Sequence, residues 1–253
     1  MKPSIRTLAV LPAAAFALMG ASAFAQDPAH PDISGIWTLT APIATAKTED
    51  GKTPPLNAKG KAIYDKNLAS AKKGNRSFDG VTECLPPGLP YVQLIAKPFQ
   101  ILQKPKQVYF LYQENRIPRW VYVDQPHPAK DDIDPTYMGD ASAKWEGDTL
   151  VIDTVGLNDK NVVDRSGLPH SADIHVIERV SIKGEILEDK LTIDDPAFYT
   201  SSWTTVAHYK RMPGNFHIPE EVCSTHFTQS STVGAKKTAA AAPAAKAEKT
   251  EKK

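Results

Sequence analysis

The sequence lacks the signatures of several common protein classes. It has no Gly-x-Ser-x-Gly nucleophile elbow, no P-loop, no dinucleotide-binding glycine pattern and no repeated Cys-x-x-Cys. The usual marks of serine-hydrolase, phosphoryl-transfer and hydride-transfer chemistry are therefore missing. Neither charge is in excess, because 30 Lys and Arg residues stand against 29 Asp and Glu residues. Without a basic stripe we expect no nucleic-acid partner, and no segment after residue 25 is apolar enough to predict a membrane span.

The first 25 residues read as a secretory signal peptide. Lys2 and Arg6 precede a short apolar stretch, which ends at the small-residue triplet Ala23-Phe24-Ala25. The stretch is too short to span a bilayer, so we expect cleavage after Ala25 and a periplasmic or secreted protein. A retained anchor is the alternative interpretation.

One folded domain is expected between the two ends of the chain, over residues 26–232. The tail 233–253 is rich in Ala and Lys and has no aromatic residue, so we expect it to be disordered. Cys84 and Cys223 are the only two cysteines. In an oxidising compartment they predict one disulfide bond across most of the domain, and a reactive free thiol is the alternative.

Short runs of β-branched and aromatic residues dominate this domain and predict an all-β fold. Several runs are separated by tight turns such as Glu146-Gly147-Asp148, which is typical of hairpins. We expect an antiparallel, up-and-down β-barrel of about 8–10 strands with one N-terminal helix, Leu56–Lys73. The Pro- and Gly-rich part of Gly74–Pro98 is expected to pack as a lid or plug. The expected strands are Ile33–Leu39, Phe99–Gln103, Gln107–Glu114, Ile117–Asp124, Ala141–Trp145, Thr149–Val155, Ile174–Lys183, Ile186–Asp194, Trp203–Arg211 and Glu221–Thr228.

Three charged residues occupy the apolar faces of expected strands. Because side chains alternate along a strand, Arg119, Glu178 and Asp189 each share a face with hydrophobic residues. A buried charge needs a partner. Either Arg119 forms an interior ion pair with Glu178 or Asp189, or these groups line a ligand pocket inside the barrel.

Proton-transfer chemistry is the reaction type that the residues leave open. His170, His175 and Glu178 form a His-x-x-x-x-His-x-x-Glu pattern, but alternation places His175 and Glu178 on opposite faces. We therefore expect no metal or other cofactor, with a catalytic metal or a structural calcium ion as alternatives. The candidate catalytic residues are Glu178, His175, His170 and Tyr137, and the candidate substrate-binding residues are Arg119, Tyr112, Asp134 and Trp120.

Several phrases of the sequence resemble a group of exported proteins of environmental bacteria that are described as lipocalin-like. They are PPGLP, DPTYMGDASAKWEGDTLVIDTVGLND, HSADIHVIERV and LTIDDPAFYT, and the similarity extends over Asp32–Cys223. The Gly35-x-Trp37 motif in the first expected strand resembles the opening of calycin barrels, in which the Trp closes the barrel base. The resemblance implies a calycin-type barrel and a periplasmic location, and implies no particular reaction.

Together these interpretations predict an exported barrel that binds a small, partly apolar molecule in its interior. Aromatic molecules belong to this class. We expect cofactor-independent acid/base chemistry of lyase or isomerase type on this molecule. Whether the protein is an enzyme stays open, because a periplasmic carrier of a hydrophobic ligand and a structural envelope protein are both compatible with the residues. The sequence makes no prediction of the oligomeric state.

Overall fold

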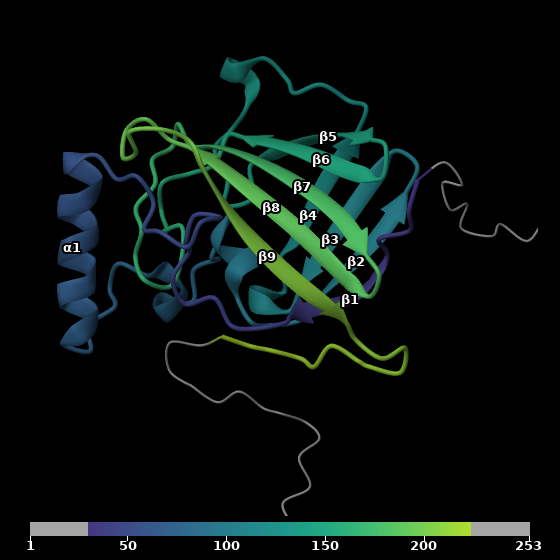
Figure 1. The fold of residues 1–253 in the computed structure, drawn as a ribbon, viewed down its shortest axis with the longest axis horizontal. Helices are drawn as coiled ribbons and strands as arrows, with labels where there is room; N and C mark the ends of the chain where they lie inside the picture. The colour runs from purple at the N-terminus through teal and green to yellow at the C-terminus, as the bar shows by residue number, and fades with distance from the viewer. Residues whose placement is uncertain (1–29, 224–253) are drawn as a thin grey trace, which may run out of the picture.

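The computed structural model describes residues 30–223, which form a closed barrel of nine strands (Figure 1). Each strand pairs with its neighbours in sequence, and β1 and β9 close the ring. The strands are β1 (Gly35–Leu39), β2 (Phe99–Lys104), β3 (Gln107–Tyr112), β4 (Pro118–Val123), β5 (Asp140–Glu146), β6 (Thr149–Val155), β7 (His175–Lys183), β8 (Ile186–Asp194) and β9 (Trp203–Arg211). The only α-helix of the described residues is α1 (Ala58–Lys72), and four 3₁₀ turns are η1 (Gly80–Glu83), η2 (Tyr91–Leu94), η3 (Glu114–Arg116) and η4 (Lys130–Asp132).

Alternation along the strands produces the core, as expected. In β8 every second residue from Leu187 to Ile193 is buried, and β3 shows the same period-two pattern. Aromatic rings pack together inside the barrel, where Phe99 lies against Phe110, Tyr112 and Tyr209 with ring centroids 5.0–6.1 Å apart. These rings form a buried aromatic cluster in the barrel interior.

One strand pair departs from the expected up-and-down topology. All neighbours are antiparallel except β4 and β5, which are parallel and paired at only two positions. A closed ring of nine strands requires such an exception, because strand direction returns to its starting sense only after an even number of antiparallel pairs. The chain between Val123 and Asp140 must therefore return from one end of the barrel to the other. We call this segment, residues 124–139, the crossover, and Figure 1 shows it above β5.

The segment before β2 plugs the barrel, as its apolar residues predicted. All four residues of η2 are buried, and Gln93 reaches the interior. There the side-chain amide of Gln93 donates a hydrogen bond to Glu178 (2.7 Å). The main-chain carbonyl oxygen of Gln93 accepts one from the hydroxyl of Tyr209 (2.7 Å). Helix α1 lies beside the barrel and begins at Asn57, whose side chain accepts a hydrogen bond from the amide of Gly60.

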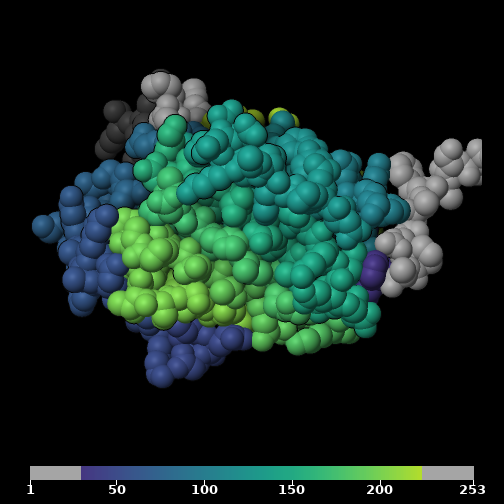
Figure 2. All heavy atoms as spheres, turned by 90° about the horizontal axis from the view of Figure 1, so that it is seen from above, coloured from purple at the N-terminus to yellow at the C-terminus, as the bar shows by residue number. Residues whose placement is uncertain are grey.

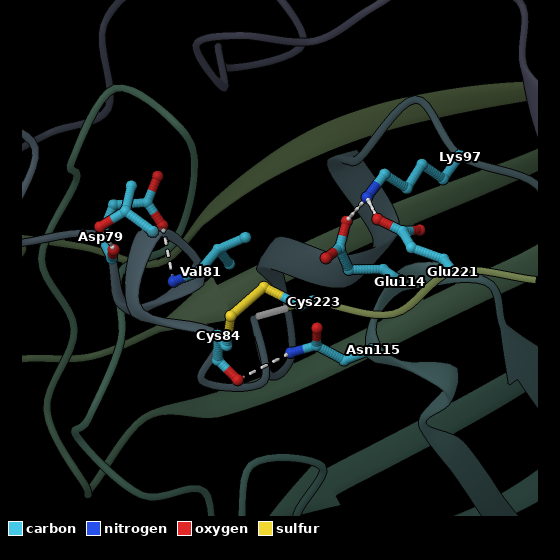
Figure 3. The surroundings of a disulfide bond; sticks show 9 residues. Asp79, Val81, Cys84, Lys97, Glu114, Asn115, Glu221 and Cys223 are labelled. Carbon is cyan, nitrogen blue, oxygen red and sulfur yellow. Dashed lines mark hydrogen bonds and ion pairs between the residues drawn. A yellow bond between two sulfur atoms is a disulfide. The ribbon is translucent and has the colours of Figure 1, made fainter. Parts of the chain in front are cut away.

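The expected disulfide bond is present and joins Cys84 to Cys223, with Cα atoms 5.5 Å apart (Figure 3). It closes a loop with a sequence separation of 139 residues. Next to it, the ammonium group of Lys97 is paired with both Glu114 and Glu221. The bond and these ion pairs attach the end of the described chain to the segments around β2 and β3.

The strand expected over Glu221–Thr228 is wrong where the structure tests it, because residues 221–223 carry no strand. This segment is instead held by the disulfide bond and the ion pair of Glu221. The remainder of that expected strand, the expected signal peptide and the expected disordered tail all lie outside the described residues. Within residues 30–223, no helix has the length and apolar character needed to cross a membrane.

Candidate functional site

The charged residues expected on inward faces are all buried in the barrel. Arg119 is 1% exposed, Glu178 0% and Asp189 1%. The guanidinium of Arg119 donates two hydrogen bonds to the Glu178 carboxylate, one of them 2.9 Å long, and a third to the hydroxyl of Thr154 (2.8 Å). The expected ion pair is therefore Arg119 with Glu178, and its bidentate geometry satisfies most of both groups.

Asp189 has a different environment, because Arg119 is already engaged by Glu178. Neither oxygen of the Asp189 carboxyl group makes a hydrogen bond within the described residues. Burial raises the pKa of Asp189 well above its usual range, and the neighbouring Glu178 carboxylate raises it further. Both effects disfavour the charged form of Asp189, and the ion pair of the interior is that of Arg119 with Glu178.

Tyr112 is, with Arg119, one of two predicted substrate-binding residues that lie in the interior. It is 5% exposed, lies beside Phe99 and Phe110, and burial raises the pKa of its hydroxyl group. Five pockets of the described residues have volumes of about 310 to 550 Å³, and none of these five is lined by Arg119, Glu178 or Asp189. Tyr112 itself lines the smallest of the five, of about 310 Å³, together with residues such as Ile117 and Ile218.

The largest of these pockets lies outside the barrel wall, between the crossover, the end of β6 and the start of β7. It has a volume of about 550 Å³, and we call it the crossover pocket. Figure 2 views the molecule from the side on which the teal crossover residues lie. The lining residues are His127, Pro128, Lys130, Ile133, Pro135, Val155, Gly156, Ala172, Asp173, Ile174 and His175.

Two imidazole–carboxylate pairs stand at this pocket. His175, the first residue of β7, places Nε2 2.6 Å from Oδ1 of Asp153 on β6. His127 in the crossover places Nδ1 2.5 Å from Oδ1 of Asp140, the first residue of β5. The pairs meet at Asp153, because Nε2 of His127 lies 3.4 Å from the same Oδ1 atom.

The strands position these side chains by alternation. In β5, β6 and β7 the inward residues are buried, while Asp140, Asp153 and His175 are half-buried on the outer face. The crossover then covers that outer face and brings His127 onto it. The arrangement can accept and donate protons, since imidazole is the side chain best suited to this near neutral pH.

Other predicted site residues do not line the crossover pocket. His170 is 7% exposed, its Nδ1 lies 3.1 Å from the carbonyl oxygen of Ser171, and burial lowers its pKa. Tyr137 is half-buried, and its carbonyl oxygen accepts a hydrogen bond from the amide of Leu89. Asp134 is exposed, and Trp120 is 50% exposed on the outside of β4. Of the predicted catalytic residues, only His175 lies at this pocket.

Three residues of this arrangement were absent from the predicted site, namely His127, Asp140 and Asp153. Alternation in the sequence already placed Asp153 and His175 on outward faces, but an outward Asp or His is also what a solvated strand shows. What was missing was the path of the crossover, which brings His127 over β5 and β6. Within residues 30–223, no three His, Cys, Asp or Glu residues are arranged to hold a metal ion.

Comparison with known proteins identified no relative. No protein-family model matches the chain, and no curated protein matches it. A functional interpretation therefore depends on the geometry of the two sites just described, the interior ion pair and the crossover pocket.

Proposed function

We propose that this protein binds a small, partly apolar molecule in the crossover pocket and performs acid/base chemistry of lyase or isomerase type on it without a cofactor. Aromatic molecules are included in this class. One observation carries the proposal: two imidazoles, each held by a carboxylate, line the same large pocket. The sequence predicted a ligand in the barrel interior, whereas this proposal places the ligand on the outer face of the barrel wall.

The pocket has the composition of a small-molecule site. Apolar side chains, including Ile133, Val155 and Ile174, make up much of its lining. The polar lining residues are His127, His175, Lys130 and Asp173. Ligand pockets commonly have volumes of about 300–1,000 Å³ and combine apolar walls with a few placed polar groups. The apolar walls suit an apolar part of the ligand, and the imidazoles suit a group that gains or loses a proton.

His175 is the catalytic residue that sequence and geometry support together. The carboxylate of Asp153 at 2.6 Å orients its ring and holds the Nε2 proton. A positioned acid or base contributes about 10²–10⁴-fold to a rate. The predicted catalytic roles of Glu178, His170 and Tyr137, and the substrate-binding roles of Arg119, Tyr112, Asp134 and Trp120, stay predictions. In this proposal Arg119 and Glu178 stabilise the barrel.

The proposal retains a lipocalin-like ancestry and export to the periplasm or cell exterior. Trp37 supports the first point, because it is fully buried in β1 and lies 4.2 Å below the guanidinium of Arg211 on β9. The disulfide bond between Cys84 and Cys223 is consistent with an extracellular or periplasmic protein.

Binding in the crossover pocket is tested by filling it. Ala172 is exposed and lines the pocket, so Ala172→Trp should occupy the space without disturbing the core. The matched control is Ala129→Trp, at an exposed crossover position outside the pocket lining. Binding of the fluorescent probe 1-anilinonaphthalene-8-sulfonate, and its displacement by a panel of aromatic carbonyl compounds, should be lost in Ala172→Trp and kept in Ala129→Trp. Equal binding by both variants and the native protein would overturn the pocket assignment.

A carrier of a hydrophobic ligand is the second candidate, favoured by the large apolar share of the pocket lining. The two functions separate at His175. In an enzyme, His175→Gln should abolish turnover of a bound compound while leaving its affinity within a few-fold. In a carrier, no bound compound would be converted by the native protein, and the His175→Gln variant would differ only in affinity.

A further inference from the structure

The two imidazole–carboxylate pairs of the crossover pocket are built with opposite ring nitrogens. Asp140 contacts His127 at Nδ1, and Asp153 contacts His175 at Nε2. A carboxylate accepts hydrogen bonds, so each contact fixes a proton on the ring nitrogen that it touches. In its neutral form His127 is therefore protonated at Nδ1, and His175 is protonated at Nε2.

The opposite nitrogen of each ring is then a free base. For His127 this nitrogen is Nε2, which is buried and makes no hydrogen bond. Its nearest acidic neighbour, Oδ1 of Asp153 at 3.4 Å, is itself an acceptor and offers no proton while ionised. An unpartnered lone pair on a partly buried ring is a poor arrangement for stability, but it is what a general base requires.

The two rings are also close enough to act on one small molecule. Both Nε2 atoms contact the same oxygen of Asp153, at 2.6 Å and 3.4 Å. The two Nε2 atoms are therefore at most about 6.0 Å apart, which is the combined length of these two contacts, and the nitrogen of His175 that Asp153 does not hold, Nδ1, belongs to the same ring. Both residues line the crossover pocket, so a bound ligand can lie beside both.

We propose that His127 and His175 form a two-base proton-transfer centre for a partly apolar carbonyl compound that carries a C–H bond next to the carbonyl group. Asp140 is the positioning residue of His127, and Asp153 is that of His175. This inference rests on the proposed function and adds His127 as a second catalytic residue and a substrate class.

The chemistry requires one ring to be neutral and the other to carry an extra proton. The free Nε2 of neutral His127 takes the proton from the carbon, and the C–H electron pair forms the C=C bond of an enol. The carbonyl oxygen takes a proton from the nitrogen of protonated His175 that Asp153 does not hold. Return of a proton to carbon, with reprotonation of His175 by the enol hydroxyl, completes an isomerisation or an exchange. No oxidant or reductant takes part.

Uncharged carbonyl compounds fit the surroundings of the two rings. Walls such as Ile133 and Ile174 offer no partner to a charged ligand, while Lys130 and Asp173 at the pocket lip are paired with each other at 3.8 Å. The acidity of a C–H bond beside a carbonyl group places its removal within reach of an imidazole base that is aided by an acid at the oxygen.

The tautomers can be tested without any substrate. Protein labelled with ¹⁵N-histidine should show His127 in the Nδ1-protonated form and His175 in the Nε2-protonated form in long-range ¹H–¹⁵N spectra above pH 7.5. In Asp140→Ala, the His127 tautomer should change while that of His175 stays. Identical tautomers at the two residues in the native protein would overturn the proposal.

The reaction is tested with cyclohexanone as the probe, by following exchange of its α-hydrogens for deuterium in D₂O by NMR. The native protein should accelerate the exchange, and His127→Gln and His175→Gln should each reduce the acceleration by about 100-fold or more. The matched control is His208→Gln, because His208 also pairs with a carboxylate (Glu188, 3.2 Å) but lies outside the pocket lining.

The outcomes distinguish this inference from the proposed function. If cyclohexanone shifts resonances of the crossover pocket and only His175→Gln lowers the exchange, the two-base centre is refuted and the pocket function stands. If cyclohexanone binds and the native protein does not accelerate exchange, the substrate class is wrong. If no resonance of the pocket responds to cyclohexanone and Ala172→Trp also leaves dye binding intact, the proposed function fails with it.

Discussion

Replacement of Arg119 by methionine should cost far more stability than replacement of both Arg119 and Glu178 by apolar residues. Arg119 and Glu178 are 1% and 0% exposed, so neither can turn to water when its partner is removed. In Arg119→Met the Glu178 carboxylate keeps a single hydrogen bond, from the amide of Gln93. Breaking a buried ion pair in this way costs about 3–5 kcal/mol of unfolding free energy.

The double variant Arg119→Met, Glu178→Leu removes both charges together. What it leaves behind is the Gln93 amide, which loses its acceptor, and the Thr154 hydroxyl, which loses its donor. The Thr154 hydroxyl loses Arg119 in both variants, so it cancels from the comparison and only the Gln93 amide counts against the double variant. One unsatisfied buried polar group costs about 1–3 kcal/mol, while well-packed apolar replacements of an ion pair are often neutral. The double variant should therefore be about 2 kcal/mol more stable than Arg119→Met, as judged from the central values of these two ranges.

Urea unfolding followed by tryptophan fluorescence measures this difference, with equal m-values as the check that both variants unfold as the native protein does. The reasoning is refuted if the double variant loses as much unfolding free energy as Arg119→Met and Glu178→Leu lose together when each is made alone. That result would mean that the two charges do not depend on each other. A further variant, Glu178→Gln, separates the two sites: if the crossover pocket is the functional one, this variant is less stable but binds ligand unchanged at a temperature where it is folded.

Three further predictions concern stability. Burial raises the pKa of Asp189, so the folded state holds a proton that the unfolded state releases above pH 4. The unfolding free energy should therefore fall as pH rises from about 4 toward the raised pKa, by up to about 1.4 kcal/mol per pH unit, and Asp189→Asn should remove this slope in urea unfolding at pH 5–8. Removing the disulfide bond, in Cys84→Ser with Cys223→Ser, should cost about 2–5 kcal/mol, since it closes a loop of 139 residues. Asn57→Ala should cost about 1 kcal/mol through loss of the α1 N-cap.

Each of these predictions has a clear contrary result. Parallel pH curves for the native protein and Asp189→Asn would mean that this carboxyl group does not carry the linked proton. An unchanged melting temperature after removal of both cysteines would mean that the ion pairs of Lys97 alone attach the chain end. A full loss of helix signal in Asn57→Ala would mean that α1 depends on its cap more than on its packing.

The period-two pattern of the strands made the interior predictable from the sequence. A strand that reads apolar at every second residue has only one face to bury, so Arg119, Glu178 and Asp189 were expected to point inward. The need of a buried charge for a partner predicted an ion pair of Arg119, which Glu178 supplies, while Asp189 has no such partner. Hairpins with short turns were predictable for the same local reasons. The Cys84–Cys223 bond followed from there being two cysteines in a chain that the sequence predicts to be exported.

The crossover could not be predicted in this way. Residues 124–139 contain no regular secondary structure beyond the short turn η4. No local sequence pattern predicts that β5 pairs in parallel with β4. The outward Asp140 and Asp153 gain their partners only when this segment crosses the outer face of the barrel. Long-range placement of an irregular segment depends on the whole barrel, which is why the predicted site contained His175 and not His127.

The odd number of strands has a consequence for how this barrel can change. The returning segment has about sixteen residues between Val123 and Asp140, which when extended could reach about 50 Å. A strand of six or seven residues is only about 20–23 Å long, so more than half of that reach is surplus to the return path. This surplus can accept insertions, deletions and new side chains without altering any strand register. In this protein the spare length of chain lies on the outside of the barrel wall, where it forms one side of the pocket.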